Sequence, residues 1–165
     1  MCSSLPSDAV YIGVHIRRGD MAIDPKYTVA DAGYFRRAVH LVMTKFPGRQ
    51  LVFVVCTDDF RWSKGNFPDA VSRGMIDRGN HSDGDVTNSK RKAVVVFSRN
   101  HVDREDLAIL SACNHTIMTV GTFGWWAAYL AGGLTIYYRK FPAENFELYQ
   151  KFSREDHFLP EWIGL

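Results

Sequence analysis

The chain has 165 residues, a length that suits one domain, and 46% of its residues are hydrophobic. That share is enough for a packed core and excludes a largely disordered chain. The formal net charge of +2 at pH 7 is too small for a nucleic-acid-binding surface, which needs a clustered basic excess. We therefore expect no nucleic-acid partner, although a local basic pocket for one phosphorylated ligand is compatible with this charge.

The cysteines and the apolar runs further limit the classes of protein to which the chain can belong. Cys2, Cys56 and Cys113 show no C-x-x-C spacing, which argues against a zinc site. Cys56 and Cys113 lie in apolar runs and are predicted to be buried thiols. There is no run of 18 apolar residues, which predicts no membrane-spanning helix, and the first residues lack the charged and apolar regions of a signal peptide. A strand is predicted almost at once after Met1, which we interpret as the sign of a fragment.

The first half of the sequence predicts two strands and one well-marked helix. Residues 9–16 and 51–56 are short apolar runs that are typical of buried strands. Apolar residues at helical spacing predict a helix over 32–45, preceded by Thr28-x-x-Asp31 as a capping box and stopped by Pro47-Gly48. A short helix around 60–64 is possible. Residues 65–92 are polar and rich in glycine, and they predict a long loop.

The second half continues the alternation. Strands are predicted at 93–97, 116–120 and 134–138, and helices at 104–112 (with Asp103 as the N-cap), 125–131 and 144–152. The strands are apolar on both faces, so the pattern predicts an α/β fold: a Rossmann-like parallel sheet with helices on both faces, formed by residues 1–165 as a single domain. Ligands of such sheets bind beyond the carboxyl ends of the strands, which here are 17–20, 57–59 and 121–124.

Two arginines follow the first predicted strand. Guanidinium groups are always charged and offer a planar fork that matches phosphate. Strand alternation places His15 and Arg17 on one face and Arg18 on the other. We therefore expect one arginine to meet the ligand and the other to pair with a carboxylate such as Asp20. A solvated charged turn is the alternative for an arbitrary pair of arginines.

A second candidate lies between the fourth strand and the helix after it, at Gly121-Thr122-Phe123-Gly124. Small residues let backbone amides approach an anion, and a helix N-terminus adds about half a positive charge. Asp106 begins another predicted helix, where acids also occur simply to complement the helix dipole. Each signal has an ordinary structural alternative, but together they describe a crevice suited to a diphosphate.

Several blocks resemble one enzyme family. The segments 12–20 and 106–133, the tail 158–164, and more weakly 53–59 with Trp62 resemble animal galactoside α-1,2-fucosyltransferases, glycosyltransferase family 11. The resemblance implies a GT-B-type architecture of two Rossmann-like halves, of which this chain is the C-terminal, donor-binding half. It implies inverting, metal-independent transfer of fucose from GDP-fucose to the 2-hydroxyl of a terminal galactose on a glycan, with no cofactor.

The resemblance also implies residue roles. The first block is shared with α-1,6- and protein O-fucosyltransferases, in which the arginine matching Arg17 holds the β-phosphate. By the same match His15 and Asp106 contact guanine and Thr122 contacts a phosphate oxygen. Arg17 is the expected catalytic group, because it takes the developing phosphate charge. Further binding residues expected around the donor are Arg18, Gly121, Phe123 and Gly124.

The general base is unassigned. Asp20, the only acid in the first motif, is a candidate for the base, but structural pairing with an arginine is the favoured interpretation. The family's cytoplasmic tail, membrane anchor and first Rossmann half are not in this sequence, so a non-catalytic GDP-fucose-binding fragment and a fucosyltransferase of another linkage stay open. The resemblance further implies a Golgi membrane protein with its catalytic part in the lumen, and Asn80 and Asn114 begin glycosylation sequons.

Overall fold

The computed structural model describes residues 8–24, 27–76, 93–99, 102–144 and 147–165. In this part of the chain six strands form one sheet in the order β3-β2-β1-β4-β5-β6, and every neighbouring pair is parallel. The strands are β1 (Val10–Ile16), β2 (Leu51–Thr57), β3 (Ala93–Phe97), β4 (His115–Met118), β5 (Thr135–Tyr137) and β6 (Ile163–Gly164). This is the strand order of a doubly wound dinucleotide-binding sheet. The predicted α/β, Rossmann-like fold is confirmed.

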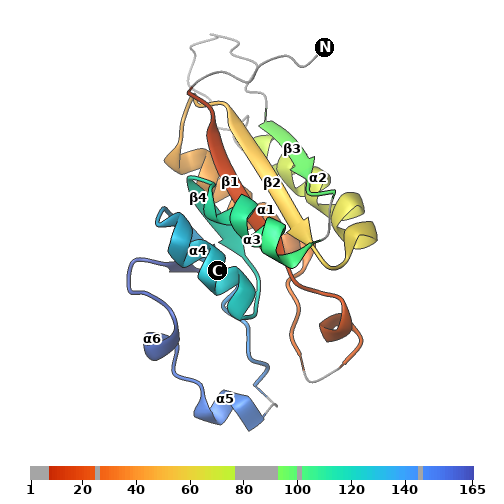
Figure 1. The fold of residues 1–165 in the computed structure, drawn as a ribbon, viewed down its shortest axis with the longest axis vertical. Coiled ribbons are helices and arrows are strands. Elements are labelled where there is room, and N and C mark those ends of the chain that lie inside the picture. Colours follow the sequence, from red (N-terminus) through yellow and green to blue (C-terminus); the bar gives the residue numbers. More distant parts are fainter. Residues whose placement is uncertain (1–7, 25–26, 77–92, 100–101, 145–146) are drawn as a thin grey trace.

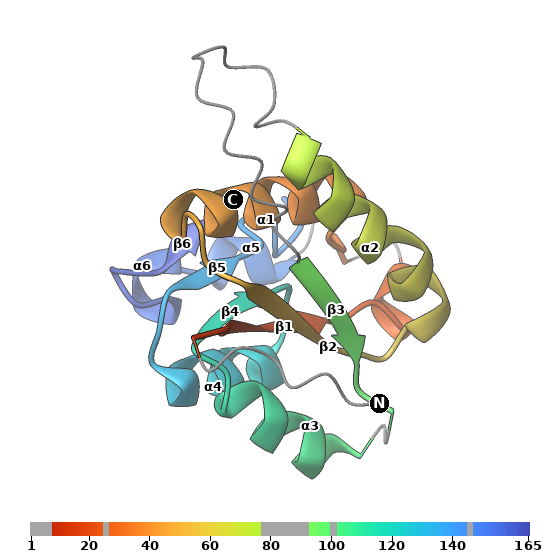
Figure 2. The same cartoon turned by 90° about the horizontal axis from the view of Figure 1, so that it is seen from above.

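Helices cover both faces of the sheet, as the apolar strands predict. The helices are α1 (Ala32–Lys45), α2 (Phe60–Ile76), α3 (Asp103–Ser111), α4 (Thr122–Ala131), α5 (Glu147–Lys151) and α6 (Arg154–His157), with a short 3-10 helix, η1, at Asp20–Ala22. Seen from above, the sheet lies between a layer of α1 and α2 and a layer of α3 and α4 (Figure 2). Figure 1 shows the same elements face on, with α3 and α4 in front of the sheet.

The main core lies between β1, β2 and the layer of α1 and α2, and a smaller cluster of Cys56, Leu110 and Ala127 lies under α3 and α4. Tyr34 of α1 crosses the main core. Its hydroxyl donates a hydrogen bond to the carbonyl of Met118, at 2.6 Å, with the carbonyl of Ile136 at 3.2 Å. The phenol is fully buried and therefore holds α1 against β4 and β5.

The long loop predicted over 65–92 is wrong for its first part, because α2 continues from Phe60 to Ile76. Gly65 and Pro68 weaken helix propensity, but Phe67, Ala70 and Val71 bury an apolar stripe against the core. Burial of that stripe outweighs the unfavourable local propensity. The remainder of the predicted loop, 77–92, lies outside the described residues, as does Asn80.

Two predicted helix caps are also wrong. Asp31 itself caps α1, because its carboxylate accepts a hydrogen bond from the Tyr34 amide at 2.7 Å; Thr28 does not begin the helix. Asp103 is the first residue of α3, and Val102 occupies the capping position. The observed caps thus lie three residues after and one residue before the predicted ones, an uncertainty usual at helix ends, whereas the predicted bounds of α1, 32–45, are confirmed.

The C-terminal part differs in detail. The last predicted helix is shorter, Glu147–Lys151, and is followed by α6 and by β6, which pairs with β5 at the edge of the sheet. The fourth strand begins one residue earlier than predicted, and α4 begins at Thr122. The predicted turn at 121–124 is therefore the start of that helix.

Candidate functional site

A pocket of about 670 Å³ lies beyond the carboxyl ends of β1, β2 and β4. The chain leaves β1 toward the α1 layer and leaves β4 toward the α4 layer, so the two connections separate and open a crevice between them. The residues lining the pocket are His15, Arg17, Met21, Cys56, Thr57, Asp58, Phe60, Asp103, Asp106, Val120, Gly121, Thr122 and Phe123.

Arg17 stands at the centre of this pocket. Its backbone amide donates a hydrogen bond to the Thr119 hydroxyl at 2.8 Å, which joins the end of β1 to the segment after β4. Its guanidinium pairs with the carboxylates of Asp58 and Asp20, the second at 2.6 Å. The side chain is 34% exposed, so the charged fork is held in place and still reaches solvent.

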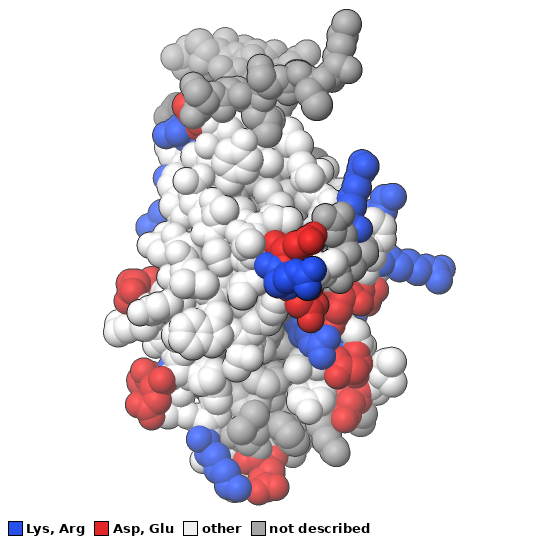
Figure 3. Space-filling view, in the orientation of Figure 1, with Lys and Arg blue, Asp and Glu red and all other residues white. Residues whose placement is uncertain are grey.

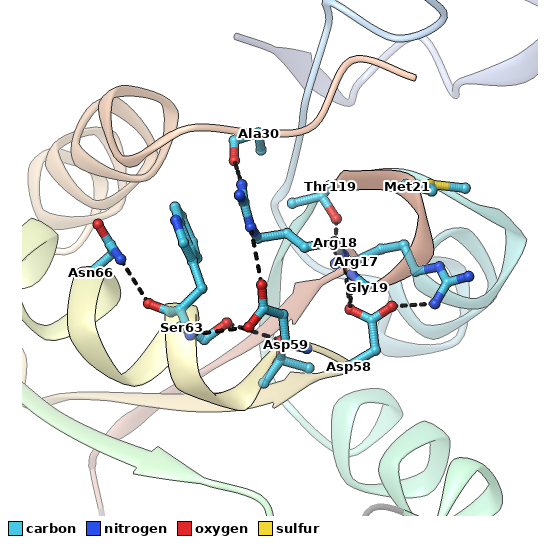
Figure 4. Close-up of polar contacts among 12 residues, drawn as sticks. Arg17, Arg18, Gly19, Met21, Ala30, Asp58, Asp59, Ser63, Asn66 and Thr119 are labelled. Atoms are coloured by element: carbon cyan, nitrogen blue, oxygen red, sulfur yellow. Dashed lines mark hydrogen bonds and ion pairs between the residues drawn. The ribbon is translucent and has the colours of Figure 1, made fainter. Parts of the chain in front are cut away.

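Arg18 points the other way, as strand alternation predicts. Its guanidinium lies 3.8 Å over the ring of Trp62 and donates a hydrogen bond to the carbonyl of Ala30 at 2.7 Å. Its Nε lies 3.6 Å from the carboxylate of Asp59. Figure 4 shows the side chains of Arg17 and Arg18 extending to opposite sides. The acidic partner of Arg18 is therefore Asp59, and Asp20 pairs with Arg17 instead.

His15 forms a wall of the pocket. Its ring faces Phe123, with ring centroids 5.2 Å apart, and lies so close to α4 that a Cβ on Gly124 would be 2.4 Å from Nδ1. Nδ1 is buried and has no hydrogen-bond partner among the residues that the structure describes. Burial, assisted by the charge of Arg17, lowers the pKa of His15 to about 4, and the nearby carboxylates oppose this shift without cancelling it. The imidazole is therefore neutral at physiological pH.

The N-terminus of α4 supplies backbone donors on the opposite side. Gly121 precedes the helix with a φ of 92°, a conformation that favours glycine and directs the first turn of α4 toward the pocket. Amides of a first helical turn lack partners within their own helix, and the helix dipole adds positive potential there. Thr122 and Phe123 belong to this turn, and the Thr122 hydroxyl adds a further donor.

Asp106 closes the deep end of the pocket. It lies in the first turn of α3, is 8% exposed, and accepts a hydrogen bond from the Ser98 hydroxyl. A buried carboxylate beside a neutral imidazole can accept N–H donors from the edge of a planar base. This end of the pocket therefore suits a nucleobase, whereas Arg17 and α4 suit an anion.

The structure brings together most of the residues expected from sequence. His15, Arg17, Asp106, Gly121, Thr122 and Phe123 all line the pocket. Arg18, Asp20 and Gly124 do not: Arg18 packs on α2, Asp20 pairs with Arg17 from the exposed η1, and Gly124 lies behind His15.

Asp58 is the main residue that sequence reasoning missed. It lies within the predicted strand-end segment 57–59, but its contact with Arg17 depends on how β1 and β2 align. The alignment pairs Ile16 with Thr57, so the next residues along the two strands, Arg17 and Asp58, come to lie side by side. The sequence signal that could have identified Asp58 is an acidic residue directly after an apolar strand, at the ligand edge of the sheet.

Other features of the described residues bear on chemistry. Cys56 and Cys113 are buried free thiols, as predicted, and burial raises the pKa of both, to about 11 for Cys113. Within the described ranges, no group of three or more His, Cys, Asp or Glu side chains is arranged to hold a metal ion. None of the helices in these described ranges has the length and apolar character needed to cross a membrane. Figure 3 shows acidic and basic side chains intermingled on the visible face.

Fold and pocket together define a class of protein. The doubly wound parallel sheet carries an arginine fork, a helix N-terminus and a buried acid around one pocket at its switch point, so the chain is a Rossmann-like α/β domain with a polar pocket at the usual ligand edge. The sequence profile of glycosyl transferase family 11 matches residues 3–165. The chain therefore belongs to glycosyltransferase family 11.

Curated relatives carry names from that family. The chain is 38% identical to galactoside alpha-(1,2)-fucosyltransferase 2 of Rattus norvegicus, across 95% of this chain and 40% of the relative. It is 39% identical to galactoside alpha-(1,2)-fucosyltransferase 1 of Homo sapiens, across 94% of this chain and 38% of the relative. It is 36% identical to galactoside 2-alpha-L-fucosyltransferase Sec1 of Mus musculus, across 95% and 38%. The chain thus spans about two fifths of the length of these relatives.

The depressed pKa of His15 predicts a pH-dependent stability. The unfolded chain takes up a proton near pH 6.5, but the folded chain does so only near pH 4, so stability falls as pH drops through this window. The full shift corresponds to about 3 kcal/mol at 1.36 kcal/mol per pKa unit. Urea unfolding from pH 7 to pH 4 should show a shallower loss for His15→Gln than for wild type. His40→Gln, on the exposed face of α1, is the control. Equal slopes for wild type and His15→Gln would contradict the assignment.

Proposed function

We propose that the pocket binds GDP-fucose and that the chain is the donor-binding part of a fucosyltransferase. The observation that carries the proposal is the convergence of Arg17, His15, Asp106 and the N-terminus of α4 on one pocket in a chain of this family. The relatives are named galactoside α-(1,2)-fucosyltransferases. On that basis the reaction is transfer of fucose to the 2-hydroxyl of a galactose at the end of a glycan.

In this proposal each end of the pocket holds one end of the donor. Asp106 and the neutral His15 bind the guanine edge, with Phe123 beside the imidazole. Arg17 and the amides at the start of α4 bind the diphosphate, with the Thr122 hydroxyl on a phosphate oxygen. An arginine fork matches two phosphate oxygens at once, and fixed amide dipoles need no rearrangement when charge develops on them.

The same groups can stabilise GDP as the leaving group. When the bond between the anomeric carbon and the phosphate oxygen breaks, negative charge grows on GDP. Arg17 and the α4 N-terminus stabilise that charge, which is the task that a divalent cation performs in metal-dependent transferases. We therefore propose metal-independent, inverting transfer, in which the galactose hydroxyl attacks from the side opposite GDP. Transfer at an undiminished rate in EDTA is what this proposal requires.

The first prediction from this proposal concerns Arg17. Arg17→Ala should weaken GDP binding by about tenfold or more, because a charge-assisted contact contributes roughly 1.5–3 kcal/mol. Arg17→Lys keeps the charge but loses the fork, so its affinity for GDP should lie between those of wild type and Arg17→Ala. Calorimetric titration of GDP into the purified chain measures this. Arg36→Ala, exposed on α1, is the matched control and should bind as wild type does. Unchanged affinity in Arg17→Ala would remove the proposed phosphate site.

The second prediction separates a complete transferase from a donor-binding fragment. Because the chain matches about two fifths of its relatives, the acceptor-binding groups of those proteins can lie in the remaining three fifths. Holding two reactants in position can contribute roughly 7–11 kcal/mol to lowering a barrier. Radiolabelled fucose transfer from GDP-fucose to a β-galactoside should therefore be far slower for this chain than for the chain fused to the N-terminal part of a relative. Equal turnover by the two proteins would place the acceptor site within these residues. Transfer to a galactose hydroxyl other than the 2-hydroxyl would contradict the proposed linkage.

A third prediction concerns location. We propose a Golgi lumenal setting, with membrane attachment through a part of the protein outside this sequence. Asn114, in the sequon Asn114-His115-Thr116, is exposed, and its side-chain oxygen accepts a hydrogen bond from the Tyr11 amide at 2.9 Å, which leaves its nitrogen for a glycan. Expression in a secretory host should give a glycosidase-sensitive mass shift that Asn114→Gln reduces. A wild-type chain without such a shift would contradict this setting.

A further inference from the structure

Arg17 is paired with two carboxylates that are held very differently. Asp58 is 29% exposed, and one of its oxygens also accepts hydrogen bonds from the backbone amides of Arg18, at 2.7 Å, and Gly19, at 3.2 Å. Asp20 is 74% exposed and lies on the short η1, where its carboxylate otherwise accepts a bond only from the neighbouring amide of Met21, at 3.0 Å, among the described contacts. Breaking the Arg17–Asp58 pair therefore disturbs a backbone loop, whereas the Arg17–Asp20 pair can open by a side-chain rotation.

The loop is shaped around Asp58. A Cβ at position 19 would lie 2.6 Å from Oδ2 of Asp58, so any residue larger than glycine would require the Asp58 carboxylate to move. Figure 4 shows Asp58 beneath this loop, with one oxygen on Arg17 and the other on the backbone of Arg18 and Gly19. A single carboxylate thus fixes both the guanidinium of Arg17 and the chain that carries it.

We propose that Asp58 is a positioning residue that aims the Arg17 guanidinium at the donor's diphosphate, and that Asp20 is the exchangeable counter-ion which the diphosphate displaces. The inference rests on the proposed function, because it requires Arg17 to bind phosphate. Asp58 holds Nη1 of Arg17, and Asp20 holds Nη2. An incoming phosphate takes the Nη2 side, since its present partner is exposed and its loss costs little. Asp20 is then released into solvent.

The two carboxylates should therefore have opposite effects on donor affinity. If both acted only through space, removing either negative charge would strengthen the binding of an anion. If Asp58 positions Arg17, removing its charge should instead weaken the binding of the anion. In Asp58→Asn the amide can still accept the loop hydrogen bonds through its oxygen, but its NH₂ group faces the donor Nη1, and the guanidinium loses its aim. In Asp20→Asn the competing anion is gone while the aim is unchanged.

The experiment is calorimetric titration of GDP, and of inorganic pyrophosphate, into wild type, Asp20→Asn, Asp58→Asn and Arg17→Ala. Asp20→Asn should bind both ligands about two- to fivefold more tightly, the range set by an exposed ion pair of up to about 1 kcal/mol. Asp58→Asn should bind them about tenfold more weakly, since one charged hydrogen bond contributes roughly a factor of ten or more. Asp59→Asn is the matched control: it removes the neighbouring charge, which pairs with Arg18 and not with Arg17, and should bind within about twofold of wild type.

Each outcome decides the matter. Tighter binding by Asp20→Asn with weaker binding by Asp58→Asn supports the proposal, whereas tighter binding by both leaves only through-space repulsion and overturns the positioning role. Unchanged or weaker binding by Asp20→Asn overturns the exchange. If Asp58→Asn does not fold, as judged by circular dichroism, Asp20→Asn decides alone. If wild type binds neither ligand, or Arg17→Ala binds both as wild type does, the proposed function fails and this inference fails with it. If Arg17→Ala loses binding but Asp20→Asn does not bind more tightly than wild type, only this inference fails.

Discussion

The site depends on the central position of β1 in a sheet that winds outward in both directions. Strands β2 and β3 lie on one side of β1, whereas β4, β5 and β6 lie on the other side. The chain must therefore leave β1 and β4 toward opposite faces of the sheet. The hydrogen bond from the Arg17 amide to the Thr119 hydroxyl keeps the two strand ends together at the base of the gap. The pocket therefore exists wherever this winding is preserved, and side chains only determine what it accepts.

Strand alternation then gives the two arginines different tasks. The end of β1 presents His15 and Arg17 toward α4 and Arg18 toward α2, where the ring of Trp62 and the carbonyl of Ala30 take up its guanidinium. One cation is used to fix the loop after β1 to the layer of α1 and α2, and the other stays available to a ligand. Exchanging these roles would require a one-residue shift in register, which would also place every side chain of β1 against the opposite layer of helices.

Sequence patterns predicted the parallel sheet, its first five strands and six of the thirteen residues that line the pocket, because buried strands and the ligand edge of such sheets have strong local signatures. They failed at α2, where Gly65 and Pro68 dominate local propensity and the decisive term is the burial of Phe67 in the tertiary core. They also missed Asp58 as a partner of Arg17. That contact arises from the register between two strands whose paired residues are 41 positions apart, which one sequence without its fold does not specify.

Charge balance is compatible with the diphosphate ligand that we propose, although the net charge of the chain is only +2. Arg17 is already neutralised by Asp58 and Asp20, and burial keeps His15 uncharged, so the pocket offers no large excess of positive charge. Attraction then comes from oriented dipoles at the start of α4 and from exchange of one weakly held carboxylate for a phosphate. Such a site favours an anion with several oxygens in fixed positions over a simple carboxylate, because the fork of Arg17 and the amides of α4 can be satisfied together only by the former. The selectivity for a nucleoside diphosphate that we propose would follow from this geometry, and the anchored Asp58 is the residue that we propose keeps the geometry in place.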